Sequence, residues 1–470
     1  MRDVFDAVIV GSGPNGLTAA ATLAVAGRRV LVLEAADAVG GGARTDDAFG
    51  SGIARDVCSA VHPTGFVSPA FADLRLTEHG LRWLTPDVSL AHVADSDVIA
   101  LRRGNRCLAE ELGVDARRWE RIVCSPDPAG LAADVLAMPG VPRRLLDMAR
   151  FGPAALSPVD VLARAFRTDR AATAFAGIAA HAGRPLSAAG SSAAGLLLGM
   201  LTTSGWPVAE GGSQAIADAL VSVIRGHGGV VETGVEVTDR AQLPSGCDVF
   251  LDTSPSLLRR LFGDQLGRRY GRALRRFDYG SGVCKVDYLL SEPIPWAHRP
   301  DVLADTATFH LAEGVEMIRA TENDVAAGRV PRRPWILGGE PTRVDPGRAP
   351  AGVHLAWAYC HVPAGCDVDM SEAITAEVER AAPGFRDTVR GTIVTTATDL
   401  ARHNANYVAG DINCGAASLR QLLARPILAR TPQVTGVPGV YLCSSATAPG
   451  GGVHGMAGHR AARAALSARR

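Results

Sequence analysis

The sequence predicts an α/β fold in which a nucleotide-binding domain is interleaved with a second domain, and three Gly-rich segments carry this prediction. Two of them, at 11–16 and 40–45, lie close together near the N-terminus, and the third, at 444–456, lies near the other end. Such turns expose backbone amides that bind phosphate where a strand meets a helix. Elements this far apart in the chain indicate one long ligand that both ends contact.

The first Gly-rich segment lies within a βαβ pattern. An apolar run at 5–10 precedes it, an Ala/Leu-rich stretch follows to Ala26, and a second apolar run covers 30–33. The first glycine makes a tight turn, the second lets the backbone approach a pyrophosphate, and the third lets helix and strand pack closely. This spacing predicts a Rossmann-like dinucleotide site with the contacts Gly11, Ser12, Gly13, Pro14, Asn15 and Gly16.

Glu34 ends the second predicted strand, 18 residues after Gly16. A carboxylate at this point can accept hydrogen bonds from ribose hydroxyls. Because its charge would repel a 2′-phosphate, NADP is the poorest dinucleotide candidate. We assign Glu34 and the adjacent Ala35 to the cofactor site.

The second Gly-rich segment lies where the chain leaves that strand and can fold back over the same pyrophosphate. An NAD domain does not need this turn, so the pair of turns favours FAD. The contacts expected here are Gly41, Gly42, Ala43 and Arg44. The segment resembles the Gly-Gly-x-x-Thr or Gly-Gly-Arg-x-x-Thr motif of FAD enzymes of the amine oxidase and phytoene desaturase superfamily, with Arg44 displaced by one place. A flexible surface loop is the alternative.

The third Gly-rich segment lies between a short apolar run at 440–443 and an Ala/Arg-rich helix at 458–470. It again presents free amides at the positive end of a helix dipole. In flavoproteins such a terminus faces the N1/C2 carbonyl edge of the isoalloxazine; the alternative is a C-terminal cap. Many flavoproteins have Gly-Asp where this chain has two serines, so a hydroxyl would replace a charged contact to the ribityl chain. The contacts assigned here are Ser444, Ser445, His454, Gly455 and Met456.

Together with the segments at 282–296 and 403–412, these motifs make the chain similar to FAD-dependent oxidoreductases of the phytoene desaturase-like group, within the amine oxidase and GDI-type flavoprotein superfamily. It resembles in particular the branch called pyridine nucleotide-disulphide oxidoreductase domain-containing protein 2. The matching segments bracket nearly the whole chain. The resemblance implies an FAD cofactor and places the backbone of Val235 against the adenine, with an ordinary core valine as the alternative.

The length of 470 residues exceeds one typical hydrophobic core and predicts two domains. The patterns along the chain assign 1–75, 205–265 and 400–470 to the FAD-binding domain. The segments 76–204 and 266–399 are assigned to a substrate domain of mixed β-sheet and helical cap. Helical periodicity marks the first of these two segments, and alternating strand patterns mark the second.

Composition excludes several classes of function. The 48 basic and 48 acidic residues balance, so nothing indicates a nucleic-acid partner. Nine cysteines form no CxxC pair and no metal-ligand spacing, which argues against a disulphide reductase and predicts no metal site. The N-terminus has no basic segment before an apolar core, so the predicted compartment is the cytoplasm. The oligomeric state is left open.

The longest uncharged stretch covers 185–209 and contains four glycines. A membrane span has to be considered, but Ser and Thr are frequent and the stretch closes with Trp206-Pro207. We expect a buried helix that roofs an apolar substrate cavity. A membrane span is the alternative, and peripheral contact with a membrane, to collect a lipid substrate, is compatible with the buried helix.

Lys285 is the only lysine of the chain, and the other permanently charged cations are arginines. Codon bias explains this replacement on the surface, so lysine should persist where a compact ammonium that can lose its proton is required. The segment from Gly282 to Trp296 resembles the amine oxidase strand whose lysine holds a water against flavin N5. Lys285 is therefore the predicted catalytic residue, and a solvent-facing sheet lysine is the alternative.

Other polar residues are weaker candidates. His62 follows the second Gly-rich segment and could approach the flavin ring, although a lone histidine is more often structural. A polar cluster before the last FAD segment either lines the pocket or braces loops; its members are His403, Asn404, Asn406, Tyr407 and Asp411. No Ser/His/Asp hydrolase order is present.

These observations predict an FAD-dependent dehydrogenase, desaturase or oxidase that transfers a hydride from a carbon of a mainly apolar small molecule to flavin N5. The cofactor carries the chemistry, while the protein positions the donor carbon and excludes water. Two alternatives are a redox-neutral flavin-dependent isomerase and a non-catalytic protein that, like Rab GDP-dissociation inhibitors, holds a prenyl or lipid partner. The intact loop at 450–456 and Lys285 favour a working flavin.

Overall fold

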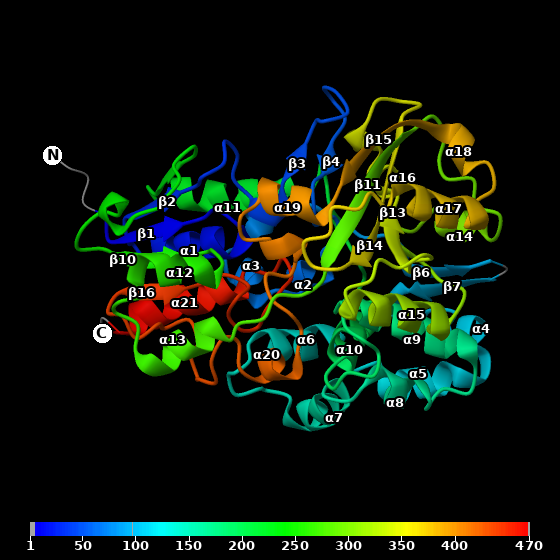
Figure 1. Cartoon of the computed structure of the whole chain (residues 1–470), viewed down its shortest axis with the longest axis horizontal. Coiled ribbons are helices and arrows are strands. Elements are labelled where there is room, and N and C mark those ends of the chain that lie inside the picture. Colours follow the sequence, from blue (N-terminus) through cyan, green and yellow to red (C-terminus); the bar gives the residue numbers. More distant parts are fainter. Residues whose placement is uncertain (1–4, 96, 469–470) are drawn as a thin grey trace.

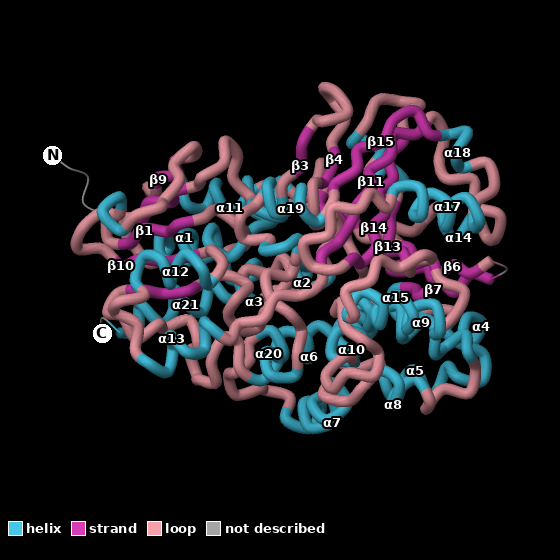
Figure 2. Tube along the Cα trace, in the orientation of Figure 1, coloured by secondary structure: helices cyan, strands magenta, loops and turns pink. Residues whose placement is uncertain are grey.

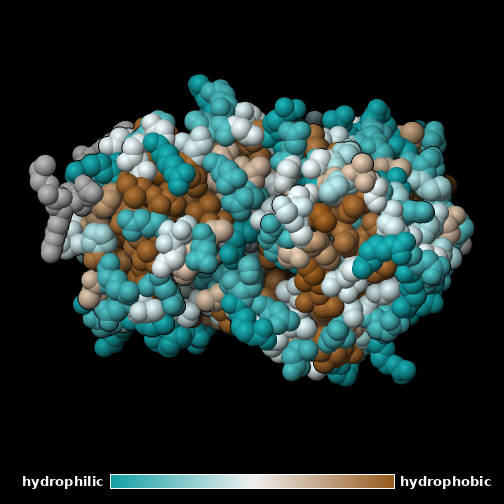
Figure 3. All heavy atoms as spheres, turned by 90° about the horizontal axis from the view of Figure 1, so that it is seen from above, coloured by the Kyte–Doolittle hydropathy of each residue, from teal (hydrophilic) through white to brown (hydrophobic). Residues whose placement is uncertain are grey.

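The computed structural model describes residues 5–95 and 97–468, which form two domains that lie side by side (Figure 1). One is built on a five-stranded parallel sheet, and the other combines a seven-stranded mixed sheet with a layer of helices below it (Figure 2). On the face seen in Figure 3, hydrophilic residues lie along the edges and between the two halves. The predicted α/β class with a Rossmann-like domain is confirmed.

The parallel sheet has the strand order β16-β10-β1-β2-β9, and all its pairings are parallel. Except for the edge strand β9, its strands are buried apolar runs, as expected when helices cover both faces of a parallel sheet. The strands are β1 (Ala7–Val10), β2 (Val30–Leu33), β9 (Val230–Glu232), β10 (Asp248–Leu251) and β16 (Val440–Leu442).

Helices cover both faces of this sheet. On one face α1 (Pro14–Val25) packs against α11 (Gln214–Gly226) and α21 (Met456–Ala468). The C-terminal helix comes so close that a Cβ on Gly458 would overlap the carbonyl oxygen of Asn15. The N-termini of α1 and α21 therefore lie together. The other face carries α12 (Pro255–Phe262) and α13 (Arg268–Arg275).

The mixed sheet has the strand order β15-β11-β14-β13-β12-β6-β7 and is antiparallel except for the β12–β6 pair. One face packs on α17 (Ser371–Ala381), and the other faces the helical layer. The strands are β6 (Val88–Ala94), β7 (Asp97–Arg102), β11 (Gly282–Leu290), β12 (Phe309–Leu311), β13 (Ile336–Gly339), β14 (His354–Val362) and β15 (Val389–Thr395).

The helical layer below the mixed sheet comes mainly from one continuous part of the chain. Its helices are α4 (Leu108–Leu112), α5 (Ala116–Ile122), α6 (Pro128–Leu136), α7 (Leu145–Ala155), α8 (Val159–Ala163), α9 (Asp169–Ala180) and α10 (Ser192–Leu201), joined by α15 (Val315–Ala326). Within residues 5–95 and 97–468, no helix has the length and apolar character that crossing a membrane requires.

Short elements connect the two domains. The strand pairs are β3 (Thr45–Asp46) with β4 (Arg55–Asp56), and β5 (Trp83–Leu84) with β8 (Val208–Ala209). The remaining helices are α2 (Pro63–Phe66), α3 (Pro69–Asp73), α14 (Pro300–Leu303), α16 (Pro341–Val344), α18 (Phe385–Thr388), α19 (Ala397–His403) and α20 (Leu419–Leu423).

Two local expectations differ from the structure. The repeated valines at 235–237 suggest a second strand after β9, but this segment pairs with no strand; the N–H of Val235 donates instead to the backbone oxygen of Glu34 at 2.8 Å. Helix α13 lies beyond the predicted boundary at 265, yet its Tyr270 and Leu274 pack into the core of the parallel sheet. Apolar side chains thus keep α13 with the nucleotide-binding domain.

Candidate functional site

A cavity of about 1130 Å³ lies between the two domains. It begins at the Gly-rich turn after β1, passes the other two Gly-rich segments, and ends among α7 and α10 of the helical layer. Ligand pockets commonly have volumes of ~300–1,000 Å³. This cavity therefore has room for an extended ligand with a second molecule beside it.

The two N-terminal Gly-rich segments touch at one end of the cavity. Gly11 has a φ of 94°, which strains any residue with a side chain. A Cβ on Gly13 would lie 2.6 Å from Oδ2 of Asp252, and a Cβ on Gly41 would lie 3.0 Å from Cα of Gly13. No space is left for side chains, so the backbone itself borders the cavity here.

Glu34 is held firmly at the same end. One of its oxygens accepts hydrogen bonds from the N–H of Ser12 at 2.8 Å and from its hydroxyl at 2.5 Å, and the other accepts from the N–H of Ala36 at 2.9 Å. Glu34, Ala35 and Val235 all line the cavity. A carboxylate oriented in this way can accept further hydrogen bonds from ribose hydroxyls.

Asp252 is a residue of this end that sequence reasoning missed. It follows β10, lines the cavity and accepts a hydrogen bond from the N–H of Gly16 at 2.8 Å. Burial raises the pKa of its carboxyl to about 7; the Gly16 N–H opposes this rise, and the charge of Glu34 adds to it. The available signal was an acid at the carboxyl end of a parallel strand, where α/β sheets bind ligands.

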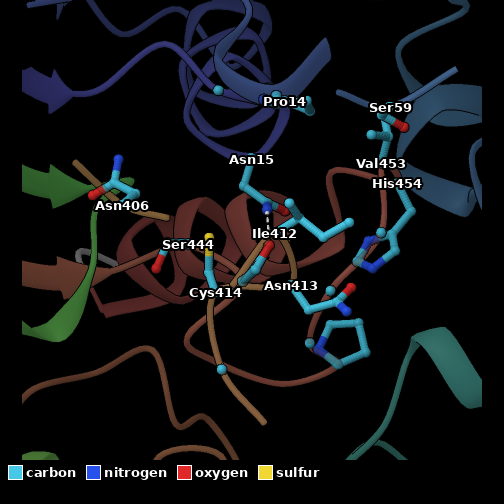
Figure 4. Close-up of a pocket in the computed structure, with 18 of the residues that line it drawn as sticks. Pro14, Asn15, Ser59, Asn406, Ile412, Asn413, Cys414, Ser444, Val453 and His454 are labelled. Atoms are coloured by element: carbon cyan, nitrogen blue, oxygen red, sulfur yellow. Dashed lines mark hydrogen bonds between the residues drawn. The ribbon is translucent and has the colours of Figure 1, made fainter. Parts of the chain in front are cut away.

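Figure 4 shows Asn15, Asn413 and His454, which come from three separate segments, around one space. The Asn15 amide donates to Oγ of Ser445 at 3.3 Å. Within the described part of the chain, Oδ1 of Asn15 and Nε2 of His454 are buried without a hydrogen-bond partner. Burial lowers the pKa of His454 to about 4, so its imidazole is neutral. Buried unpartnered polar atoms are costly, which fits a ligand with polar edges at this point.

Most of the predicted cofactor residues line the cavity, and these are Gly11, Ser12, Gly13, Pro14, Asn15, Glu34, Ala35, Gly41, Gly42, Arg44, Val235, Ser444, Ser445 and His454. Those that do not are Gly16, Ala43, Gly455 and Met456. A Cβ on Gly16 would overlap the carbonyl oxygen of Gly11, and one on Gly455 would overlap the hydroxyl of Thr18. Met456 packs into a small apolar cluster. These residues shape the site by allowing close packing.

Lys285, the predicted catalytic residue, is on β11 and does not line the cavity. Its Nζ donates to the backbone oxygens of Asp56 at 2.6 Å and Val57 at 3.3 Å and to the carboxylate of Asp287 at 2.6 Å. The residue is 3% exposed, so the alternative of a solvent-facing lysine is wrong. Cys58, the residue after Val57, does line the cavity. A water on the ammonium would have to replace one of three existing partners, and the catalytic role stays a prediction.

Lys285 belongs to a buried charge network. Asp287 also pairs with Arg55 at 3.1 Å, and Arg55 pairs with Asp46 on β3. Burial raises the pKa of Asp287, while Lys285 and Arg55 act against this rise. Removing one member of such a network leaves an uncompensated buried charge. The network therefore fixes the segment after the second Gly-rich turn on the mixed sheet.

The weaker candidates divide into two groups. His62 does not line the cavity; its Nε2 lies 2.9 Å from Oγ of Ser213, and burial lowers the pKa of His62 to about 4. Asp411 braces a loop, because its carboxylate accepts from the N–H groups of Gly280 and Gly415. The cavity-lining members of the polar cluster are His403, Asn404, Asn406 and Tyr407.

The far end of the cavity is apolar and aromatic. As expected, the uncharged stretch at 185–209 supplies a helix, α10, over this space. The wall is interrupted by two histidines, His181 and His361, which sequence reasoning missed because they lie in no recognisable motif. Its larger apolar members are Phe151, Leu156, Leu197, Leu198, Trp206, Trp357 and Tyr359.

The described residues of this site include no cluster of side chains that could bind a metal ion. Among residues 5–95 and 97–468, no group of three or more His, Cys, Asp or Glu side chains is arranged to hold a metal ion. In the part of the chain that the structure describes, no two cysteines are joined by a disulfide. The groups that face the cavity are instead backbone amides, amides of Asn, imidazoles and carboxyl groups.

The chain is similar to known oxidoreductases. Residues 9–74 match a family model described as an NAD(P)-binding Rossmann-like domain. The chain is 25% identical to pyridine nucleotide-disulfide oxidoreductase domain-containing protein 2 of Rattus norvegicus, over 98% of this chain and 93% of the rat protein. This confirms the resemblance found in the motifs.

Two solved structures share the fold along the whole chain. An oxidoreductase from Methanosarcina mazei has a TM-score of 0.65 at 16% identity, over 98% of this chain and 99% of that one. Putrescine oxidase has a TM-score of 0.64 at 18% identity, over 99% of both chains. The interleaved arrangement of a parallel-sheet domain and a mixed-sheet domain is therefore a fold that this chain shares with these two proteins.

Proposed function

We propose that this chain is an FAD-dependent oxidoreductase that acts as a dehydrogenase, desaturase or oxidase on a mainly apolar small molecule. One observation carries the proposal: the space that borders the Gly-rich turns and Glu34 continues into a compartment walled by Leu, Phe and Trp side chains. An extended dinucleotide can thus reach the apolar compartment with its reactive end. FAD, when bound, supplies the hydride acceptor at N5 and the route of the electrons to an acceptor.

The residues at the nucleotide end match the groups of such a cofactor. Glu34 would accept from ribose hydroxyls, and the amides of the turns at 11–16 and 41–42 would donate to the pyrophosphate. The unpartnered Oδ1 of Asn15 and Nε2 of His454 would meet polar edges nearer the reactive end. These contacts bind and orient the cofactor without taking part in bond making.

The apolar compartment would bind the substrate and exclude water. Its wall comes from the helical layer on one side and from β14 on the other. A dry wall strengthens electrostatic interactions at the reacting atoms and prevents loss of a reactive intermediate to water. Lys285, behind Cys58, is proposed to support proton movement at the reactive end of the cofactor.

We also propose that the cavity opens toward a membrane surface. Large apolar side chains are exposed on α7 with its preceding turn, at the end of α20 and on the segment that follows it. This apolar collar consists of Val141 (87% exposed), Leu145 (64%), Leu146 (83%), Leu423 (56%) and Leu428 (66%). Leu423 and Leu428 also line the cavity, so the collar is continuous with it. Exposed arginines at 143, 150, 420 and 430 lie within four residues of a collar residue in the chain and suit anionic headgroups.

The membrane proposal is tested by sedimentation with phosphatidylcholine vesicles, with and without phosphatidylserine. The double variant Leu145→Glu, Leu146→Glu should lower the vesicle-bound fraction at least about tenfold, because two carboxylates would enter the interface. Val25→Glu is the matched control, since Val25 is 52% exposed at the end of α1 and outside the collar. Equal binding of the collar variant and the control would refute the proposal.

A reducing compartment such as the cytoplasm is proposed as the location. The structure joins no two of the cysteines it describes by a disulfide. Disulfides persist in oxidising compartments and are rare in the cytosol. Cysteines that form no disulfide among the described residues therefore support this location.

The central test uses the purified protein. We expect a yellow protein with a flavin absorbance spectrum and about one FAD per chain after dialysis. Anaerobic addition of apolar alcohols, ketones and amines should then bleach the flavin band with at least one of them. A colourless protein that ignores added FAD would favour a GDI-like lipid-binding protein. Turnover without net bleaching and without an acceptor would favour a redox-neutral isomerase.

A further inference from the structure

His361 and Glu322 form a buried pair at the substrate end of the cavity. Nδ1 of His361 lies 2.7 Å from Oε1 of Glu322. His361 is on β14 and lines the cavity, whereas Glu322 is on α15 and is 1% exposed. In the described part of the chain, His361 is the one side chain that pairs with this carboxylate, and Oε2 of Glu322 has no hydrogen-bond partner. Neither residue belongs to the cofactor motifs.

The pair fixes the orientation of the imidazole. A carboxylate acceptor at Nδ1 holds the neutral ring with its proton on Nδ1 and leaves a lone pair on Nε2. Nε2 of His361 makes no hydrogen bond with the residues that the structure describes. It also differs from the polar atoms that are fully buried without a partner, because it is not one of them. Since His361 lines the cavity, this nitrogen is the accessible basic atom of the pair.

The strand register places the imidazole between the two compartments. His361 lies opposite Val283, and Tyr359 lies opposite Lys285, in the β11–β14 pair. Side chains on one face alternate along a strand, so Tyr359 and His361 face the same side. Tyr359 and Val283 line the cavity together with Cys58, beside the Gly-rich segments. His361 would therefore lie beside the end of a bound substrate that is nearest the cofactor.

The neighbours of His361 do not compete for its proton. Its ring lies 5.5 Å from the ring of Trp335 and 6.0 Å from the ring of Tyr359. Burial lowers the pKa of the nearby His181 to about 3, with a further contribution from His361. Burial raises the pKa of Tyr359, so this phenol stays protonated. Glu322 is thus the carboxyl group that contacts His361 directly.

We propose that His361 is a catalytic base of this oxidoreductase and that Glu322 is its positioning residue. The inference rests on the proposed function and narrows the substrate to an apolar alcohol or ketone. With an alcohol, the carbinol carbon gives a hydride to FAD, the hydroxyl proton passes to Nε2 of His361, and a C=O bond forms. With a ketone, the α-carbon gives its proton to Nε2, the β-carbon gives the hydride, and a C=C bond forms. In both cases the substrate loses two electrons and the flavin gains them.

The first test reads the imidazole directly and needs no cofactor. Protein labelled with ¹⁵N in its histidine rings is examined by NMR, and His361→Gln assigns the signals. We expect a neutral ring with the proton on Nδ1 and a pyridine-type Nε2. In Glu322→Gln the side-chain amide can donate to Nδ1, so the other tautomer should gain population. A wild-type ring with its proton on Nε2 would overturn the proposal, and so would a tautomer that Glu322→Gln leaves unchanged.

The second test measures anaerobic flavin bleaching of the holoenzyme by cyclododecanol, cyclododecanone and cyclododecylamine. A neutral amine gives up a hydride without losing a proton to a base in the same step. His361→Gln and Glu322→Gln should therefore slow bleaching by the alcohol or the ketone about 10²- to 10⁴-fold, with FAD content unchanged and with a smaller effect on any amine reaction. His92→Gln is the matched control, because His92 is buried nearby but does not line the cavity.

The outcomes separate this inference from the proposed function. A protein that holds FAD but is bleached by none of the three probes, or by the amine alone, overturns the substrate class. Bleaching by the alcohol or ketone at an unchanged rate in His361→Gln overturns the role of His361 and leaves the oxidoreductase standing. A protein without FAD overturns the proposed function, and the NMR measurement still decides whether the pair is arranged as a base.

Discussion

The two ends of the cavity are built from different parts of the chain. At the nucleotide end the wall is backbone, because Gly13 and Gly41 approach each other too closely for side chains. At the substrate end the wall consists of side chains such as Phe151, Trp206 and Trp357, which come from segments far apart in sequence. A wall of backbone requires glycine at fixed positions, whereas many combinations of apolar side chains fill the same volume. The nucleotide end can therefore be recognised in the sequence, whereas the substrate end cannot.

The largest expected effect comes from adding atoms to the backbone wall. Gly13→Val should abolish FAD retention, because its Cβ would lie 2.6 Å from Oδ2 of Asp252 and its methyl groups would occupy pyrophosphate space. The matched control is Gly152→Ala at the substrate end, where an added Cβ meets nothing within 4 Å. Flavin absorbance per chain after dialysis measures the effect, with circular dichroism as the check on folding. Full FAD occupancy in Gly13→Val would contradict the claim that closely packed backbone forms the wall at the nucleotide end.

The second effect concerns Lys285, which lies behind the junction of the two ends. If it supports proton movement at the cofactor, Lys285→Met should slow flavin reduction or reoxidation by roughly 10²- to 10⁴-fold, and at least about tenfold. Lys285→Arg should not restore the rate, since guanidinium is bulkier and does not titrate. The methionine variant should also melt at lower temperature, because three buried acceptors lose their donor.

Stopped-flow traces of both half-reactions measure this effect. Arg390→Met on the neighbouring strand β15 is the control, since Arg390 is an exposed cation. Rates within a factor of about two of wild type in both half-reactions would make Lys285 a purely structural member of the charge network.

The sequence predicted those lining residues that belong to motifs, including Ser444, Ser445 and His454 near the other end of the chain. The turn at 11–16 and Glu34 are separated by a single helix and strand, so their spacing alone predicts their meeting. His361 and Glu322 meet only because α15 packs beside β14, and nothing in either segment indicates the partner. The sequence shows that Lys285 is the only lysine. Its contacts with Asp56 and Val57, however, join residues that are more than 220 positions apart in the chain. Long-range packing between segments that carry no motif is what the sequence alone left undetermined.

The third effect tests the side chain that best fits the nucleotide end. Glu34→Arg should raise the FAD dissociation constant roughly ten- to hundredfold, as expected for losing about 1.5–3 kcal/mol of hydrogen bonding with a charged group. The change also removes the acceptor of the Ser12 and Ala36 N–H groups. Glu34→Gln keeps the shape and should give a smaller loss. Calorimetric titration of the FAD-free protein measures both, and an unchanged constant in Glu34→Arg would remove Glu34 from the site.

The smallest effect concerns Asp252, a side chain within the backbone wall. Burial raises the pKa of its carboxyl to about 7, so the group is neutral in acid and becomes an anion as the pH rises through 7. The anion would repel a pyrophosphate beside Gly16. FAD affinity should therefore be nearly constant below about pH 6 and fall roughly tenfold between pH 6.5 and 8. Asp252→Asn keeps an acceptor for the Gly16 N–H and should abolish this dependence. Equal pH profiles for wild type and Asp252→Asn would mean that the pyrophosphate binds away from this carboxyl, and the nucleotide end would then be defined by the backbone of the Gly-rich turns and by Glu34.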